Sequence, residues 1–487
     1  MNLRANITPV NTWLEGEPLR ASVTIAVVVL AAVIMVAAIA TDRVLALGMG
    51  VGFLLFAVFS YYQPAPAVLL AMLLSTDVLK FVDLTYLPSV RLGPAGRFNA
   101  LDVVVIMLFV LGLLRLRQRH ERPLFLLPLF GFAVIVALSY LLGVVGGTTD
   151  ISLGLNGLRS LSPYLFYIGL AGVIDTRQKL FTVIWLIFTL LFISVVVQLV
   201  EASLGQRLTA PASVVNEDYA TTKTVQVGLL SAPYLWNRAT SFLFLGLFVS
   251  VSGALWLRSW MHALLASLAL MGFVVALMRQ WYLMVALGML VIFLLPRKGR
   301  LPAIMGLALA AVVLIRLVFY PPFGLTLSYP LIDVWIARLA TVGQFQQEQN
   351  FIARLETWQG QLTLFRENPL FGYGPGSVNL LSERVSFYFS DTGVPNTLVQ
   401  YGLFGCLAVV TLIIAFFRRA HDLFRLLPVS KEKGYLAGLI GAWVGIAAGY
   451  SFGFDFFTSA EYAFATALAM ALLDRLTMLS PREISTR

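Results

Sequence analysis

Arginine side chains recur beside the apolar segments of this chain and in its longest polar segment. Five of them could act on one ligand: Arg159, Arg238, Arg279, Arg338 and Arg354. A guanidinium group stays charged at physiological pH and binds two phosphate oxygens in a bidentate fashion. A single arginine at the end of a span could equally anchor that span at the membrane interface, with Trp281 and Tyr282 as an aromatic belt beside Arg279. Their recurrence predicts a binding site for an anionic head group.

The carboxylate of Asp391 is the best-placed candidate for a base in the same part of the chain. A transfer reaction with an anionic leaving group needs cations for the developing charge, and its acceptor benefits from a base. We expect Asp391 to deprotonate or orient the acceptor, with Glu356 and Glu383 as weaker alternatives. The sequence Asp-Thr-Gly that begins at Asp391 is also typical of a turn or a helix cap. Both interpretations stay open.

Metal, nucleotide and disulfide chemistry find no support in the sequence. The single cysteine, Cys406, has no partner for a disulfide. The three histidines, His120, His262 and His421, fall in or near the predicted cytoplasmic side, so no histidine and cysteine zinc site can form on the other side. Neither a P-loop nor a dinucleotide fingerprint is present. We therefore predict no metal, no cofactor and no direct use of ATP.

The composition is typical of a protein that lies mostly in a lipid bilayer. Hydrophobic residues make up 59% and charged residues 12% of the 487 residues, and the mean hydropathy is +0.86. These values exclude an ordinary soluble domain. Apolar runs of this length cross a bilayer as helices, so we predict an all-α polytopic membrane protein with about 14 transmembrane helices. The predicted spans are 21–40, 44–61, 65–81, 101–114, 123–145, 161–174, 180–200, 239–257, 259–278, 281–295, 301–319, 397–417, 434–452 and 459–473.

The distribution of basic residues predicts the orientation of these spans. With the amino terminus inside, 20 of the 34 lysines and arginines but only 8 of the 24 acidic residues fall on the cytoplasmic side. Clusters of Lys and Arg after the fourth, tenth and twelfth spans all lie on that side, as the positive-inside rule requires. We therefore expect a multi-pass plasma membrane protein with both termini in the cytoplasm. The basic pI is explained by topology and does not indicate nucleic-acid binding.

This orientation divides the chain into three parts and places two large loops outside. Residues 1–319 hold the first eleven spans and the outer loop 201–238, residues 320–396 form an extracytoplasmic loop, and residues 397–487 hold the last three spans and a cytoplasmic tail. A long polar loop in an otherwise apolar chain is a common place for function. We expect the main chemistry of the protein at the loop 320–396.

Within this loop, apolar residues recur at the spacing of one helix face from Phe351 to Phe365. This face could dock onto the membrane domain or onto the bilayer interface. Arg354 and Gln361 lie off its centre and are carried together by the helix. Asn368 and Pro369 are expected to end the helix. The turn that follows, with Gly372 and Gly374, could let its backbone approach a ligand closely or could simply close the loop.

At these positions the chain resembles the superfamily of O-antigen ligases and O-antigen polymerases (Wzy-type), which are bacterial membrane glycosyltransferases. The matching positions are Arg354 and Trp358 in R-x-x-x-W, residues 368–374 in N-P-L-x-G-x-G, and Gly402 and Gly405 in YGLFG. Arg238 and Arg279 also look like the arginines that this family carries at its later spans. The matching residues are few, but their order, the loop position and the predicted number of spans agree with the family.

The resemblance implies a GT-C-like fold and a metal-independent glycosyltransferase that uses undecaprenyl diphosphate as glycan carrier on the outer face of the bacterial plasma membrane. Arg238, Arg279 and Arg354 would bind the diphosphate, with Arg159 and Arg338 as further candidates. Asp391, Arg279 and Arg354 would be the catalytic residues. The implied partners are the undecaprenyl-diphosphate-linked glycan, membrane lipid, a chain-length regulator and a flippase.

Polymerisation of repeat units into a surface polysaccharide, such as O-antigen or exopolysaccharide, is the activity that the resemblance favours. Ligases of the family carry a histidine eleven residues before the position of Gly402, and this chain has Asp391 there. The alternatives are an O-antigen ligase that transfers glycan to a lipid or protein acceptor, a lipid-linked oligosaccharide flippase, and a peptidoglycan polymerase of the shape and division family. A flippase typically shows related halves and charges at mid-membrane, and we find no internal repeat.

Overall fold

The computed structural model describes residues 55–76, 90–91, 97–98, 100–204, 224–227, 230–233, 240–276, 279–295, 349–377, 392–453 and 455–479. Its internal contacts divide the chain into two compact units, Met1–Ala67 and Val68–Arg487. The described part of the first unit comprises the short helix Leu55–Tyr62 and the start of the next helix. The site discussed below lies entirely within the second unit.

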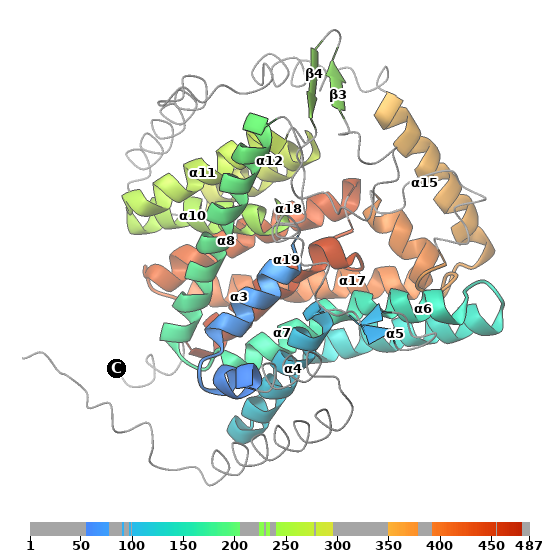
Figure 1. Ribbon diagram of the computed structural model, residues 1–487, viewed down its shortest axis with the longest axis horizontal. Helices are drawn as coiled ribbons and strands as arrows, with labels where there is room; N and C mark the ends of the chain where they lie inside the picture. The colour runs from blue at the N-terminus through green and yellow to red at the C-terminus, as the bar shows by residue number, and fades with distance from the viewer. Residues whose placement is uncertain are drawn as a thin grey trace, which may run out of the picture. The chain divides into compact units, whose positions relative to one another are not determined.

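Helices form most of the described chain (Figure 1). They are α3 (Ala65–Leu74), α4 (Ala100–Arg119), α5 (Leu126–Val145), α6 (Ile151–Gly157), the 3-10 helix η5 (Leu158–Leu161), α7 (Ser162–Val173), α8 (Arg177–Leu204), α10 (Thr240–Leu257), α11 (Trp260–Ala276), α12 (Arg279–Leu294), α15 (Gln349–Glu367), α17 (Gly393–Leu426), α18 (Lys431–Phe452) and α19 (Ala460–Leu479). Two short antiparallel hairpins join them: β1 (Val90–Arg91) with β2 (Arg97–Phe98), and β3 (Thr224–Val227) with β4 (Leu230–Pro233).

Six helices in the described ranges are long and apolar enough to cross a membrane: α5, α8, α10, α17, α18 and α19. The number becomes seven if the short helix Leu55–Tyr62 and α3 together form one span. The prediction of a polytopic helical membrane protein is therefore confirmed. Of the remaining predicted spans, α4, α7, α11 and α12 are present as helices that are shorter or more charged, whereas 21–40 and 301–319 lie outside the described residues.

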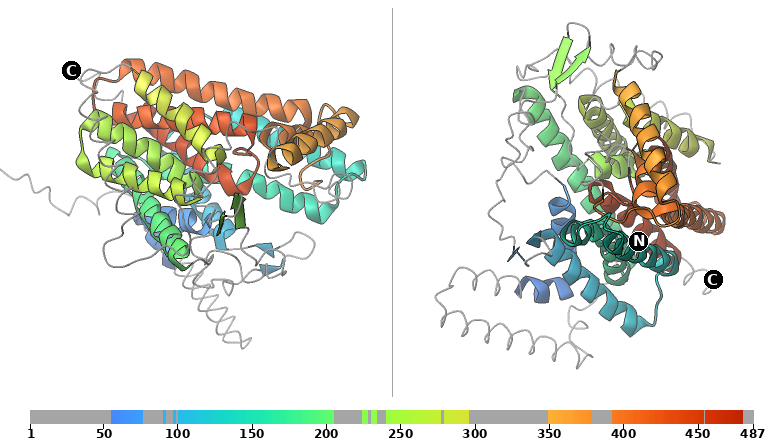
Figure 2. Two further views of the ribbon diagram at one scale, coloured as in Figure 1. Left: turned by 90° about the horizontal axis from the view of Figure 1, so that it is seen from above. Right: turned by 90° about the vertical axis from the view of Figure 1, so that its right-hand side faces the viewer.

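The helix α18 lies at the centre of the second unit, because α10, α12, α17 and α19 all pack against it. The helix α15 of the predicted loop packs against α17 near one end of that long helix (Figures 1 and 2). It ends at Glu367, directly before Asn368 and Pro369, as the sequence predicts. The first residue of α17 is Gly393, so this helix begins four residues before the predicted span.

The helices α4 and α7 pack backbone against backbone. A Cβ atom added to Gly172 would lie 2.1 Å from the carbonyl oxygen of Gly112, and one added to Gly112 would lie 2.6 Å from the Cα of Gly169. Small residues at a helix contact are the usual means of close packing in membranes, where the surrounding lipid provides no hydrophobic drive for association. The side chain of Arg119 also donates a hydrogen bond to the carbonyl of Gly172 across this contact.

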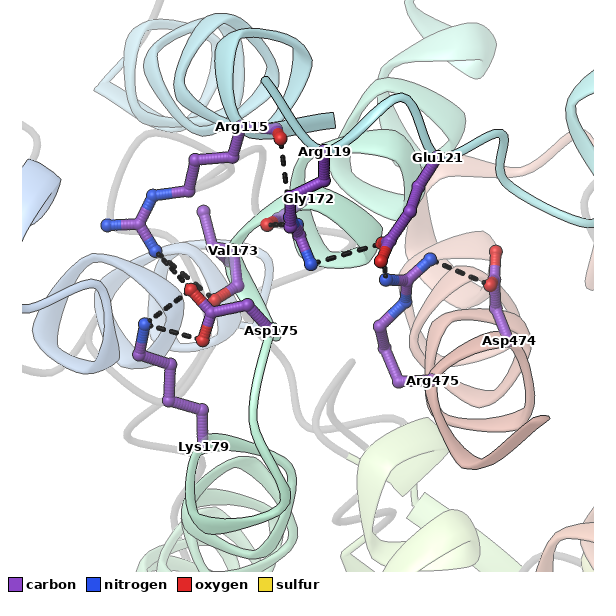
Figure 3. A network of polar contacts seen from close by, with 9 residues as sticks. All are labelled: Arg115, Arg119, Glu121, Gly172, Val173, Asp175, Lys179, Asp474 and Arg475. Atoms are coloured by element: carbon purple, nitrogen blue, oxygen red, sulfur yellow. Dashed lines mark hydrogen bonds and ion pairs between the residues drawn. The ribbon is translucent and has the colours of Figure 1, made fainter. Parts of the chain in front are cut away.

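A network of charged side chains connects the ends of α4, α7, α8 and α19 (Figure 3). Between α7 and α8, Asp175 accepts two basic partners: its carboxylate lies 3.4 Å from Nη1 of Arg115 and 2.7 Å from Nζ of Lys179. Both basic groups are largely buried, so the pairing satisfies charges that lipid would not solvate. The network therefore fixes the start of α8 beside the end of α4.

The second half of this network surrounds Arg475, whose side chain is fully buried. Its guanidinium group lies 2.9 Å from Glu121 and 2.9 Å from Asp474. Asp474 also accepts hydrogen bonds from the hydroxyl of Tyr167 at 2.7 Å and from the backbone N–H of Leu124 at 3.0 Å. The contacts bring these charged groups together at one end of the helices.

The glycine contact between α4 and α7 leads to a prediction on stability. Replacement of Gly172 by alanine forces the two backbones apart, and we expect the free energy of unfolding to fall by about 1–3 kcal/mol, as for other overpacked cores. The matched control is Gly131→Ala in α5, because no atom lies within 4 Å of a Cβ at that position. Thermal unfolding in detergent checks both variants. Equal unfolding temperatures for the two would contradict the close contact.

Candidate functional site

The helix α17 is broken near its amino-terminal end, at Gly402. This residue has φ 66° and ψ −163°, which lie outside the helical region. A broken helix leaves carbonyl groups before the break and N–H groups after the break without their intrahelical partners. In an apolar environment each of these groups needs another partner, because no water is available to replace it.

The glycine-rich turn after α15 supplies these partners. The N–H groups of Tyr373 and Gly374 donate to the carbonyls of Val399 and Gln400, at 2.8 and 2.9 Å. In the opposite direction, the N–H groups of Leu403 and Phe404 donate to the carbonyls of Pro369 and Leu370, at 2.8 and 3.2 Å. Four backbone hydrogen bonds therefore join the turn 368–376 to the break in α17. We call this arrangement the turn–break contact.

Glycines are required on both sides of the turn–break contact. A Cβ atom on Gly402 would lie 2.3 Å from the carbonyl oxygen of Leu370, and one on Gly372, where φ is 67°, would lie 2.4 Å from the carbonyl oxygen of Val399. Gly374 approaches the backbone of Ser139 in α5 in the same way, at 2.9 Å. Of the two roles considered for Gly372 and Gly374, these contacts favour closure of the loop against neighbouring helices over a direct approach to a ligand.

A second point of convergence is Trp281, in the first turn of α12. Its side chain is fully buried, and its ring centroid lies 5.3 Å from Phe244 of α10, 5.7 Å from Phe273 of α11, 5.9 Å from Phe456 and 6.3 Å from Tyr462 of α19. The interpretation of Trp281 as part of an exposed aromatic belt is therefore wrong. The ring instead holds the start of α12 against three helices and the turn between α18 and α19.

That turn carries Asp455, a buried carboxylate that the sequence did not single out. Its oxygens accept hydrogen bonds from the Nδ2 of Asn396 at 2.8 Å, from the backbone N–H of Phe457 at 3.2 Å, and from the backbone N–H of Thr458 at 2.8 Å, whose hydroxyl donates as well. Burial raises the pKa of Asp455, and these hydrogen bonds oppose the shift. Because Gln400 donates to Asn396 at 2.8 Å, the carboxylate also fixes the first turns of α17.

The apolar stripe of α15 was predicted to dock onto either the membrane domain or the bilayer interface. Thr357, Gln361 and Leu364 are buried, whereas Leu355 and Leu362 of the apolar stripe are 46% and 39% exposed. Of the two alternatives, the exposure of these two leucines favours contact with the bilayer interface. Gln361 is fully buried, and within the described residues neither atom of its amide has a hydrogen-bond partner.

Some of the predicted site residues lie within the described part of the chain and others lie outside it. Arg279 is the first residue of α12, and Arg354 lies in α15. Arg338 and Asp391 lie outside the described residues, as does Arg238, two residues before α10. Asp391 directly precedes Thr392, the residue before α17.

The remaining predicted arginine, Arg159, lies in η5 and forms an ion pair with Asp102 of α4, with Nη2 3.2 Å from Oδ2. This pair neutralises part of the charge that was expected to bind an anion. The next residue, Ser160, lies close to the broken helix: its Oγ is 3.4 Å from the hydroxyl of Tyr401. The described residues contain no group of three or more His, Cys, Asp or Glu side chains that could hold a metal ion.

Several of these elements nevertheless meet at one end of the bundle. The start of α12 contacts the α18–α19 turn through Trp281 and Phe456, and that turn contacts the start of α17 through Asp455 and Asn396. The turn–break contact then joins α17 to the segment that follows α15. The sequence did not predict the buried contacts that bring these helices together, and the predicted arginines and Asp391 stay predictions.

We predict that Gly402→Ala disrupts the turn–break contact. The added methyl group strains a residue with positive φ and collides with Leu370, so the free energy of unfolding should fall by about 2 kcal/mol or more. Hydrogen exchange at the N–H groups of Tyr373 and Leu403 should accelerate. Gly147→Ala is the control, since Gly147 also has a positive φ of 67° but has no atom within 4 Å of a Cβ position. Unchanged exchange at both N–H groups in the Gly402→Ala protein would refute the role of the contact.

Sequence comparison identifies a known domain in this part of the chain. Residues 279–410 match the family model Wzy_C, described as O-antigen ligase. The match begins at Arg279, includes α15 and the glycine turn, and ends just beyond the break in α17. Among curated proteins no sequence matches the chain. The resemblance predicted from the motifs is therefore confirmed for residues 279–410, about a quarter of the chain, which match the O-antigen ligase domain.

Proposed function

We propose that the protein is a glycosyltransferase that polymerises oligosaccharide repeat units carried on undecaprenyl diphosphate, at the outer face of a bacterial plasma membrane. The observation that carries this proposal is the O-antigen ligase domain, whose two motif segments, N-P-L-x-G-x-G and YGLFG, bind each other in the turn–break contact. Its product would be a surface polysaccharide such as O-antigen or exopolysaccharide. The helices would follow a GT-C-like arrangement with both termini in the cytoplasm.

The proposed reaction is displacement of a lipid diphosphate by a sugar hydroxyl. The hydroxyl oxygen of the acceptor forms a bond to the anomeric carbon of the donor glycan, and the bond from that carbon to the diphosphate oxygen breaks. Asp391 accepts the proton of the hydroxyl group. Arg238, Arg279 and Arg354 bind the diphosphate oxygens as their negative charge increases, which lowers the barrier without a metal ion. Arg338 is a further candidate, and Arg159 contributes less because Asp102 shares its charge.

The residue at the position of Asp391 favours the polymerase over the ligase. Both activities transfer a glycan from the same class of donor, and they differ in the acceptor. A ligase of this family carries a histidine at that position, whereas a carboxylate here would orient and deprotonate the hydroxyl of a growing glycan. Transfer to a lipid or protein acceptor is the second candidate function, because the matching family model is described as O-antigen ligase. A flippase and a chain-length regulator would be the functional partners.

The direct test uses the purified full-length protein in detergent or nanodiscs with an undecaprenyl-diphosphate-linked repeat unit. We expect a ladder of longer lipid-linked glycans without ATP and in the presence of a metal chelator. Transfer of a single unit to an added lipid or peptide acceptor, with no ladder, would assign the ligase activity instead. Movement of the donor across liposome membranes without any elongation would contradict a transferase of either kind.

The two arginines within the matched domain provide a second prediction. Arg279→Ala and Arg354→Ala should each abolish the ladder, because a permanent charge that binds the leaving group is lost. The unfolding temperature of both variants should stay close to that of the unsubstituted protein. Arg366→Ala is the matched control, since Arg366 lies on the same helix as Arg354 with its side chain exposed. Elongation at an unchanged rate in either of the first two variants would refute that residue's assignment.

A further inference from the structure

A group of buried polar side chains lies where α8, α10 and α11 meet, outside the domain at residues 279–410. Ser194, Gln198 and Glu201 recur on one face of α8, at spacings of four and three residues, and all three are fully buried, as is Thr240 at the start of α10. Within the described residues, neither atom of the Gln198 amide has a hydrogen-bond partner, and the hydroxyls of Ser194 and Thr240 have none either. We call these four residues the α8 polar cluster.

Packing between the helices places Gln198 of α8 beside both α10 and α11. A Cβ atom added to Gly272 of α11 would lie 2.9 Å from Oε1 of Gln198 and 3.1 Å from the side chain of Leu243 of α10. Thus Gln198, Gly272 and Leu243 meet. A Cβ atom added to Gly246 of α10 would lie 2.7 Å from the side chain of Leu191 of α8, so the two helices run in opposite directions. Glu201 and Thr240 therefore lie about one turn beyond Gln198 and Leu243, at a similar level of the bundle. Because Gly272 has no side chain, the Gln198 amide can occupy the space beside it.

The α8 polar cluster is close to the start of α12, where Arg279 lies. Phe273, the neighbour of Gly272, contacts Trp281 at 5.7 Å between ring centroids, and its carbonyl accepts a hydrogen bond from the hydroxyl of Tyr282 at 3.3 Å. Two of the three arginines proposed to bind the diphosphate are therefore near members of the cluster: Arg238 in sequence, two residues before Thr240, and Arg279 as the first residue of α12. A group attached directly to that diphosphate would lie within reach of the cluster.

The chemistry of these side chains selects the kind of ligand. A buried amide without partners is unfavourable in an apolar environment and is seldom retained without a function. The Gln198 amide offers one acceptor oxygen and an NH₂ donor, so a ligand that both donates and accepts satisfies it fully. A hydroxyl group does both. A phosphate group accepts only and would be repelled by the nearby Glu201, whereas a cation would leave the amide N–H groups unpaired.

We propose that the α8 polar cluster binds the hydroxyl groups of the sugar that is attached directly to the diphosphate of the lipid carrier. This inference rests on the proposed function. Gln198 donates to one oxygen of the sugar and accepts from a neighbouring hydroxyl, while Glu201 and Thr240 bind on the outer side. The amide is covered in the ligand-free chain, and rotation about its side-chain torsions turns it toward Glu201 and Thr240 when the sugar arrives. The cluster thereby selects for the first sugar of the repeat unit.

Binding of two defined lipids to the full-length protein in nanodiscs tests this site. The probes are undecaprenyl diphosphate carrying one hexose or N-acetylhexosamine, and undecaprenyl diphosphate without sugar. We expect Gln198→Leu to weaken binding of the glycosylated probe by about tenfold or more, since two hydrogen bonds are lost. Binding of the sugar-free probe should not change. Thr240→Val, which keeps the side-chain shape and removes the hydroxyl, should weaken the glycosylated probe selectively as well.

Stability measurements separate a binding role from a structural role. Removal of an unpaired buried amide should leave the unfolding temperature of the ligand-free protein unchanged or raise it, whereas loss of a structural contact would lower it. Gln178→Leu is the matched control, because Gln178 lies at the opposite end of α8 with its side chain exposed. It should change neither affinity nor stability.

The outcomes distinguish this inference from the proposed function. If the unsubstituted protein binds both probes and Gln198→Leu changes neither affinity, or weakens both equally, the sugar site is refuted while the proposed function stands. A lowered unfolding temperature in the ligand-free Gln198→Leu protein would also refute it. If the unsubstituted protein binds neither probe, both the sugar site and the proposed function are refuted.

Discussion

The site depends on one constraint above all: a membrane helix can be broken only where another segment satisfies the backbone groups that the break exposes. In α17 the break at Gly402 exposes carbonyls on one side and N–H groups on the other, and the turn after α15 pairs with both. Because each unpaired group in an apolar environment is strongly unfavourable, the turn and the break stabilise each other. The helix that carries Arg354 is thereby tied to the helix that follows Asp391.

A second set of contacts extends this connection to the start of α12. Trp281 packs on Phe456, and the neighbouring Asp455 binds Asn396 in the first turn of α17. The carboxylate accepts hydrogen bonds from several donors at once and is fully buried, so a change on either side of it would leave donors unpaired. Segments that are more than 100 residues apart in sequence, at Trp281 and at Asn396, are in this way held in a common framework.

The bounds of several helices could be predicted well from the sequence, whereas the surfaces that these helices contact could not. The apolar runs gave α5, α10 and α18 to within a few residues, and Asn368 and Pro369 marked the end of α15 correctly. These features are local, since helix length and helix termination depend on residues close in the chain. The prediction that Trp281 belongs to an aromatic belt was wrong because the sequence pattern of an aromatic residue beside an arginine is the same whether the ring faces lipid or protein. What covers the apolar face of α15 stayed open between two alternatives for a related reason: periodicity shows that one side of a helix is apolar, not what covers that side.

The break in α17 and the importance of Asp455 could not be read from the sequence, because neither disturbs the local pattern. Gly402 lies in an apolar run that continues on both sides, and glycine is common in membrane helices. The positive φ and the approach of Leu370 distinguish it from Gly405 in the same helix. Asp455 stands alone between aromatic residues and gives no spacing that could be recognised as a motif. Both features depend on residues that are distant in sequence.

The same framework explains why an anionic group would be bound at this end of the bundle. The helices α10, α12, α17 and α19 all begin there, as the contacts of Trp281 with Phe244 and Tyr462 and of Asp455 with Asn396 require. The amino-terminal end of a helix carries partial positive charge and free N–H groups, so several such ends favour a negative ligand more than one does. Arg279, as the first residue of α12, begins its helix in the same region. The electrostatic character of this end of the bundle is therefore set in part by the membrane helices themselves.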